Sequence, residues 1–259
     1  MISLNSFVTK IPEILESIDE QGIELPDMTN RAFIGNGNAF HIARLYAMKM
    51  NGTVFRAEET FRLPKSQEAC IISASGGKDS INVAKHFSDV TLITCNPKAP
   101  SKKFATKTIV LPSEKEPPFY NVTTYSGMIY LLERIKPSTP FEDEVLLKEL
   151  NYNAIILISS LKTHPITSMT ALKIREMFGK MALSLTREEA YHGWFLHPTK
   201  NEGLITVDTE FELNHPYSMK GNLLDLLSQF YFNIGILQKR LKPRTPDYEK
   251  VIRIRKWKL

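Results

Sequence analysis

Cysteine is scarce in this sequence, which has only Cys70 and Cys95 among its 259 residues. Both lie in apolar, strand-like runs, so we expect two buried thiols in a reducing cytoplasm and no disulfide framework. Long hydrophobic runs are also lacking. The longest, such as residues 154–159 (AIILIS), have the length of a strand and cannot span a bilayer. The first residues show no signal-peptide pattern, so we expect a cytoplasmic protein outside the membrane.

Motifs for nucleic-acid or metal binding are absent as well. The net charge is +5, and much of the excess lies in residues 239–259. Because no nucleic-acid-binding motif accompanies this charge, we interpret it as a solvated surface or as a potential that attracts an anionic substrate. His41, His86 and His197 are not spaced from cysteine or carboxylate residues as metal ligands are. We therefore expect no metal, no cofactor and no nucleic-acid partner.

Short apolar runs alternate with amphipathic segments along the chain. The runs typical of strands are 31–35, 53–56, 69–73, 90–95, 108–111, 154–159 and 204–207. The segments typical of helices are 10–20, 39–50, 81–87, 122–135, 141–150 and 223–241. This alternation predicts an α/β protein in which mostly parallel sheets are covered by helices on both faces, in three layers.

A polar, proline-rich stretch at 113–118 (SEKEPP) is a candidate linker, so we expect two units, residues 1–118 and 119–259.

One loop between a strand and a helix has the composition of a phosphate site. Residues 73–80 read SASGGKDS. The free N–H groups at a helix start bind anions, and glycines such as Gly76 allow a close approach of the backbone. Ser73 and Ser75 can donate hydroxyl hydrogen bonds, and Lys78 adds a positive charge. A phosphate group fits this loop better than a neutral ligand does.

A second glycine-bearing turn, residues 35–40 (GNGNAF), also follows a predicted strand. Parallel sheets bind ligands beyond the carboxyl ends of their strands, so Gly37 and Asn38 are candidate ligand contacts. The third glycine of a dinucleotide-binding fingerprint is missing, which excludes that assignment.

The stretch 171–193 (ALKIREMFGKMALSLTREEAYHG) carries the candidate catalytic groups. It begins as an amphipathic helix in which Lys173 and Glu176, three residues apart, share one face. His192 and Gly193 follow later. A carboxylate, an ammonium group and an imidazole in one pocket could move a proton on a sugar carbon.

This stretch resembles the ALKxxE … ExxHG segment of sugar isomerase (SIS) domain proteins, especially the isomerase half of glucosamine-6-phosphate synthase. The other two motifs agree with the resemblance. Residues 73–78 are similar to the S-x-S-G-x-T turn that holds the sugar phosphate in this family, with Lys78 in place of the threonine. Residues 35–39 resemble its G-x-G-x-S turn, with Ala39 in place of the serine. The resemblance implies two SIS-type α/β units.

The resemblance also implies roles for individual residues. Glu176 would be the base of an aldose–ketose isomerisation through an enediol or enolamine. His192 would open the sugar ring from the neighbouring subunit, so we expect a homodimer with its site at the interface. Lys250 lies near the position of a C-terminal lysine of the family. On chemical grounds, the Lys173 ammonium group could neutralise a developing oxyanion or simply cap a helix face. The substrate would be a phosphorylated hexose or hexosamine, and aminosugar-phosphate deamination or deglycation stays open.

Two other functions stay open at this point. The loop 75–80 (SGGKDS) also resembles the pyrophosphate-binding loop of ATP pyrophosphatases, in which Asp79 would be needed and His192 would not. A non-catalytic SIS module that binds a sugar phosphate would keep the serine loop and would not need Glu176. His215 is a secondary candidate, because residues 212–215 (ELNH) resemble a segment of phosphoglucose/phosphomannose isomerases.

Overall fold

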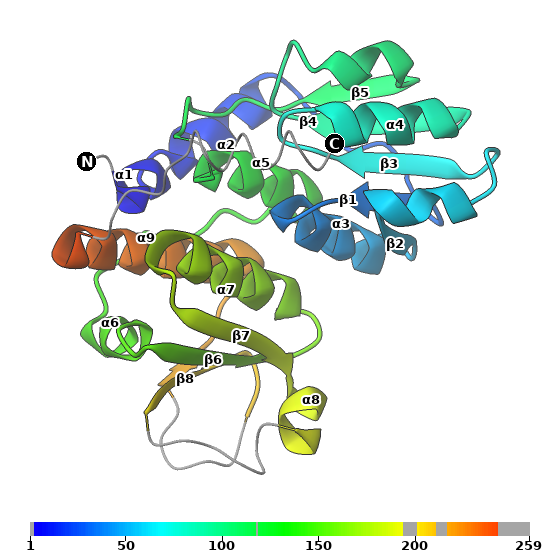
Figure 1. The fold of residues 1–259 in the computed structure, drawn as a ribbon. Coiled ribbons are helices and arrows are strands. Elements are labelled where there is room, and N and C mark those ends of the chain that lie inside the picture. The colour runs from blue at the N-terminus through cyan, green and yellow to red at the C-terminus, as the bar shows by residue number, and fades with distance from the viewer. Residues whose placement is uncertain (1–2, 118, 194–200, 211–216, 243–259) are drawn as a thin grey trace.

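The computed structural model describes residues 3–117, 119–193, 201–210 and 217–242, which form two parallel β-sheets (Figure 1). The first sheet has the strand order β2-β1-β3-β4-β5. Its strands are β1 (Ala32–Gly35), β2 (Thr53–Arg56), β3 (Glu68–Ile72), β4 (Asp89–Thr94) and β5 (Lys107–Val110). All neighbours in it run parallel. The central strands β1, β3 and β4 are short, nearly continuous apolar runs because both faces of this sheet are covered.

The second sheet has the strand order β7-β6-β8-β9 and is also parallel. Its strands are β6 (Ala154–Ser159), β7 (Met181–Thr186), β8 (Glu202–Val207) and β9 (Tyr217–Met219). This order repeats that of the first four strands of the first sheet. The predicted α/β class with two similar units is therefore confirmed.

Helices cover the sheets and fill the space between them (Figure 1). They are α1 (Leu4–Val8), α2 (Ile11–Glu20), α3 (Asn38–Lys49), α4 (Lys78–His86), α5 (Val122–Glu133), α6 (Glu144–Leu150), α7 (His164–Phe178), α8 (Arg187–His192) and α9 (Leu223–Leu241), with short 3-10 helices η1 (Ala57–Arg62) and η2 (Pro100–Phe104). Side chains alternate between the two faces of each strand. Phe33 and Cys70 therefore enter a core shared with α3, α5, α7 and α9, whereas Ile34 and Ile71 pack with α4 on the opposite face.

The two halves of the chain are joined by this shared core. α1 packs on α9, where Gly235 lies so close to Asn5 that a Cβ atom would collide with the Asn5 backbone nitrogen. α2 packs on α5. The division at residues 118 and 119 stays a prediction. It separates the two sheets in sequence, while the N-terminal helices pack on helices of the second half. Among the described residues, no helix is both long and apolar enough to cross a bilayer.

Candidate functional site

The first sheet has a point at which the strand order reverses. From β1 the chain continues to β2 on one side, and β3 pairs with β1 on the other side. A crevice forms beyond the carboxyl ends of two such strands, because their loops leave in opposite directions. Two adjoining cavities, of about 1060 and 440 Å³, lie there. They share the lining residues Asn36, Ala57, Asp79, Val83, Phe119, Asn121 and Tyr125.

The loop after β1 forms one wall of the cavities. Gly35 has no room for a Cβ atom, which would collide with the backbone of Ala39, so the chain turns tightly into α3. The Asn36 side chain donates to the Asp79 carboxylate at 2.9 Å and accepts from the Ala57 N–H at 3.1 Å. These bonds fix the β1 loop against the starts of α4 and η1. Asn38 lines the larger cavity, and its amide oxygen is buried without a hydrogen-bond partner in the described structure.

The serine loop after β3 lines the smaller cavity through Ser73, Ser75, Gly77 and Lys78. Gly76 is buried behind it with a φ of 59°, and its N–H donates to Ser73 Oγ at 3.1 Å. That bond leaves the Ser73 hydroxyl hydrogen available to a ligand. Because α4 begins at Lys78, its first N–H groups lie next to this turn, as anion binding requires.

Helix α7 carries the predicted base into the larger cavity. Glu176 lines that cavity, and its Oε2 lies 2.8 Å from Lys173 Nζ. The Lys173 side chain is fully buried, whereas that of Glu176 is 23% exposed. Lys173 also donates to the backbone carbonyl of Phe119, and its Nζ lies 5.9 Å from the ring centroid of Tyr231. Lys173 and Glu176 therefore share one face of the helix, as predicted, and the buried ammonium group of Lys173 orients the Glu176 carboxylate.

Two further ionisable residues, Glu116 and Tyr231, lie near this ion pair. Burial raises the pKa of Glu116, although hydrogen bonds from Thr123 and Val122 and the charge of Lys173 oppose that rise. Burial, and then the nearby carboxylate of Glu176, raises the pKa of Tyr231 well above its ordinary value. Tyr231 therefore stays protonated, and its hydroxyl is buried with no hydrogen-bond partner among the residues described.

The predicted site residues of the C-terminal half are placed differently. His192 ends α8, is exposed, and does not line either cavity, so within one chain it does not share a cavity with Glu176. Its role in a dimer stays a prediction. Lys250, His197 and His215 lie outside the described residues. In the described part of the chain, no group of three or more His, Cys, Asp or Glu residues could hold a metal ion.

Sequence reasoning missed several residues that line the site. Phe119 and Asn121 line both cavities, and both have a positive φ, of 71° and 48°. They directly follow the stretch interpreted as a linker, which carries no motif. Asn36 lies within the GNGN turn, and its position between two glycines could have indicated a role beside Asn38.

No protein-family model and no curated protein sequence matches the chain, so comparison rests on structure. A proposed phosphosugar isomerase from Silicibacter pomeroyi is 14% identical, with a TM-score of 0.70 over 94% of this chain and 100% of that one. The C-terminal domain of glucosamine-fructose-6-phosphate aminotransferase from Francisella tularensis is 11% identical, with a TM-score of 0.66 over 90% and 93% of the two chains. A glucosamine-6-phosphate deaminase from Thermotoga maritima is 13% identical, with a TM-score of 0.66 over 94% and 96%. At such identities the likeness shows the fold, and the chain has the two-unit α/β fold of the sugar isomerase type that its sequence resembles.

Proposed function

We propose that this chain is a phosphosugar isomerase, which moves a proton between C1 and C2 of a phosphorylated hexose or hexosamine. One observation carries the proposal. The carboxylate of Glu176, oriented by the buried Lys173, lines a cavity that adjoins the serine loop at the reversal point of the first sheet. This arrangement supports a site in which the serine loop would bind the anionic end of a ligand and Glu176 would act on its other end.

The serine loop would hold the phosphate of the substrate. Ser73 and Ser75 offer hydroxyl groups, the start of α4 offers N–H groups, and Lys78 offers a positive charge. Asn38, whose amide oxygen has no hydrogen-bond partner among the residues that the structure describes, lines the larger cavity and would accept a hydrogen bond from a sugar hydroxyl or amine. The reacting carbons would then lie in the larger cavity, where Glu176 is.

The reaction would need one base that works in both directions. Glu176 would take the proton from C2 of the aldose, which leaves an enediolate, or an enolamine where the substrate carries an amine. Lys173 would stabilise the negative charge that develops. Return of the same proton from Glu176 to C1, together with a shift of the C2 hydroxyl proton to the C1 oxygen, gives the ketose, so the atoms balance without any further reactant.

Ring opening would be assigned to a second subunit. Because His192 is exposed and outside the cavity of its own chain, we propose that it acts in the site of a partner subunit in a homodimer. Lys250 is proposed to reach the same site. The scarcity of cysteine favours a cytoplasmic location for this enzyme.

The test is deuterium incorporation at C1 and C2 of phosphorylated hexoses and hexosamines incubated with the protein in deuterated water. Wild type should incorporate deuterium into at least one of these sugars. Glu176→Gln should stop incorporation while ligand binding persists, and Glu144→Gln, at an exposed position of helix α6, serves as the matched control.

Other outcomes would assign the other functions. Binding without exchange in wild type would indicate a non-catalytic sugar-phosphate module, and release of ammonia would indicate a deaminase. Release of pyrophosphate from ATP, lost in Asp79→Asn, would indicate an ATP pyrophosphatase and contradict the proposal.

A further inference from the structure

The start of helix α5 is held by a carboxylate from outside the helix. Glu116 accepts hydrogen bonds from the N–H groups of Val122 and Thr123 and from the Thr123 hydroxyl, each at 2.5 Å. The residue at the usual capping position, Asn121, makes no side-chain capping bond. Because nearly all of α5 is buried, its first N–H groups cannot turn to water and need a partner in the protein. Glu116 supplies that partner from six residues before the first residue of the helix.

This capping interaction ties Glu116 to the start of the helix. Phe119 and Asn121, between Glu116 and the helix, both have left-handed backbone conformations, with φ values of 71° and 48°. Asparagine tolerates this conformation, but for a bulky residue such as phenylalanine it persists only where the surrounding structure enforces it. Both residues line the cavities. Strained backbone is thus held in place at the candidate site.

Phe119 is connected to Glu176, the proposed base, through the side chain of Lys173. The Phe119 carbonyl accepts a hydrogen bond from Lys173 Nζ, and Lys173 in turn pairs with Glu176 at 2.8 Å. Lys173 is fully buried, so its ammonium group cannot be reoriented by water. A shift of the Phe119 carbonyl would therefore move the ammonium group, and the Glu176 carboxylate with it.

From these contacts we infer that Glu116 is a positioning residue. Glu116 holds the backbone at Phe119 in place. The Phe119 carbonyl orients the Lys173 ammonium group, and that group orients the Glu176 carboxylate in the larger cavity. This inference rests on the proposed function only for its effect on catalysis, because the mechanical link from Glu116 to Lys173 exists whatever the ligand.

Glu116→Gln tests the link by a split between kcat and KM. The Gln amide keeps one acceptor oxygen but places an NH2 group against a backbone N–H, so the capping is weakened while the shape is kept. We expect kcat for isomerisation to fall about tenfold or more, because a misplaced catalytic group is costly to the rate. KM should change by less than about twofold, since Glu116 itself lines neither cavity and the serine loop is held by the end of β3 and the start of α4.

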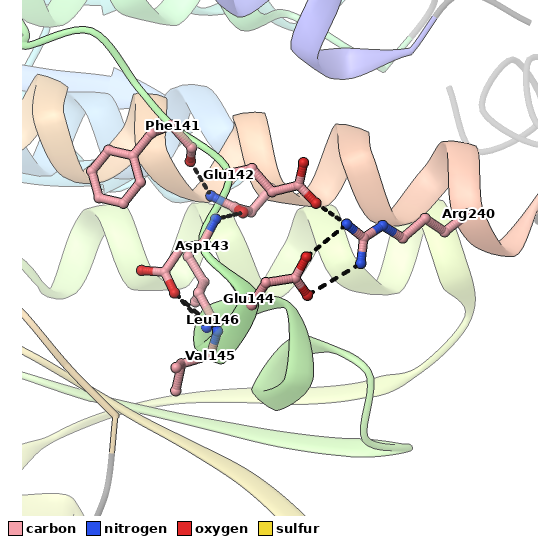
Figure 2. Close-up of polar contacts among 8 residues, drawn as sticks. Phe141, Glu142, Asp143, Glu144, Val145, Leu146 and Arg240 are labelled. Carbon is pink, nitrogen blue, oxygen red and sulfur yellow. Dashed lines mark hydrogen bonds and ion pairs between the residues drawn. The ribbon is translucent and has the colours of Figure 1, made fainter.

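A matched control separates positioning from simple helix capping. Asp143 caps α6 by accepting from the N–H groups of Val145 and Leu146 at 3.0 Å, as Figure 2 shows, and it does not line the cavities. Asp143→Asn makes the same carboxylate-to-amide change at this cap and should leave kcat unchanged. The inference is overturned if Glu116→Gln keeps the wild-type kcat, or if Asp143→Asn lowers kcat equally at an equal loss of stability.

A second measurement needs no substrate. The buried ammonium group of Lys173 should give a slowly exchanging ¹H–¹⁵N resonance, assigned by its loss in Lys173→Met. In Glu116→Gln this resonance should broaden or disappear as the Phe119 carbonyl is released, and in Asp143→Asn it should persist. If wild type exchanges no sugar proton, the proposed function fails, and this resonance alone decides on the positioning role. A resonance unchanged in Glu116→Gln overturns it.

Discussion

Replacement of the buried lysine is the perturbation for which the structure gives the clearest energetic expectation. Lys173→Met keeps the aliphatic stem in its buried position and removes the ammonium group. The carboxylate of Glu176 then loses its counter-ion, and the Phe119 carbonyl loses a donor. Removal of one partner from a buried ion pair costs about 3–5 kcal/mol in general. Here the Glu176 side chain is 23% exposed to the cavity, so water relieves part of this cost, and we expect a loss of about 2–3 kcal/mol.

Urea denaturation measures this loss. With a slope of about 2–3 kcal/mol per M, the midpoint should fall by about 1 M while the slope stays the same. A double-mutant cycle gives the control. Lys173→Met combined with Glu176→Gln should be less destabilised than the sum of the single variants by about 1 kcal/mol or more, because the second change removes the unpaired charge. An unchanged midpoint in Lys173→Met, or additive effects in the cycle, would show that the ion pair does not stabilise the folded protein.

Three further predictions concern the loop, the histidines and the surface. Ser75→Ala should weaken sugar-phosphate binding by roughly 1–3 kcal/mol, measured by calorimetry; an unchanged Kd would remove Ser75 from the phosphate site. Burial, and then the charges of Arg44, His164 and Arg56, lower the pKa of His41 from 6.5 to about 4. The proton is thus bound more weakly in the folded protein, so stability should fall as the pH drops from about 6.5 to 4, by at most on the order of 3 kcal/mol. His41→Gln should flatten this decline in urea midpoints, and an unaltered decline would assign it to other groups. Arg240 pairs with Glu142 and Glu144 at an exposed site, as Figure 2 shows. Arg240→Ala should therefore cost less than about 1 kcal/mol in thermal unfolding, and a larger loss would show that the pair is more than a surface contact.

The regular elements were predictable where the local pattern and the tertiary structure agree. The run 154–159 is strand β6 and the segment 223–241 is helix α9, because the apolar side chains of both enter the shared core. Strand β7 was not predicted. It is an edge strand with exposed Met181 and Leu183, so its sequence lacks a continuous apolar run. Strand β9, with three residues, is too short to show a pattern.

Helices α4 and α7 begin earlier in the structure than the sequence predicts. Helix α7 begins at His164, seven residues before the predicted start at residue 171, with Pro165 in its first turn, where proline costs no hydrogen bond. Helix α4 begins at Lys78, three residues before the predicted start.

The site was only partly predictable. The pairing of Lys173 and Glu176 follows from helical spacing alone, and the structure confirms it. The contact made by Glu116 was not predicted. Glu116 lies in a polar, proline-rich stretch interpreted as a linker, and such a sequence is typical of exposed chain. Its carboxylate instead accepts hydrogen bonds from the first N–H groups of α5, and that contact depends on tertiary structure. Sequence spacing cannot show such a contact, nor the meeting of Glu176 with the loop after β1 in the larger cavity.

The central claim is that Glu176 transfers a proton between adjacent carbons of a phosphorylated sugar. The most direct test compares deuterium at C1 and C2 after incubation with wild type, Glu176→Gln and Glu144→Gln, at matched ligand occupancy. The account predicts incorporation with wild type and Glu144→Gln, and none with Glu176→Gln. Incorporation at the wild-type rate in Glu176→Gln would contradict it.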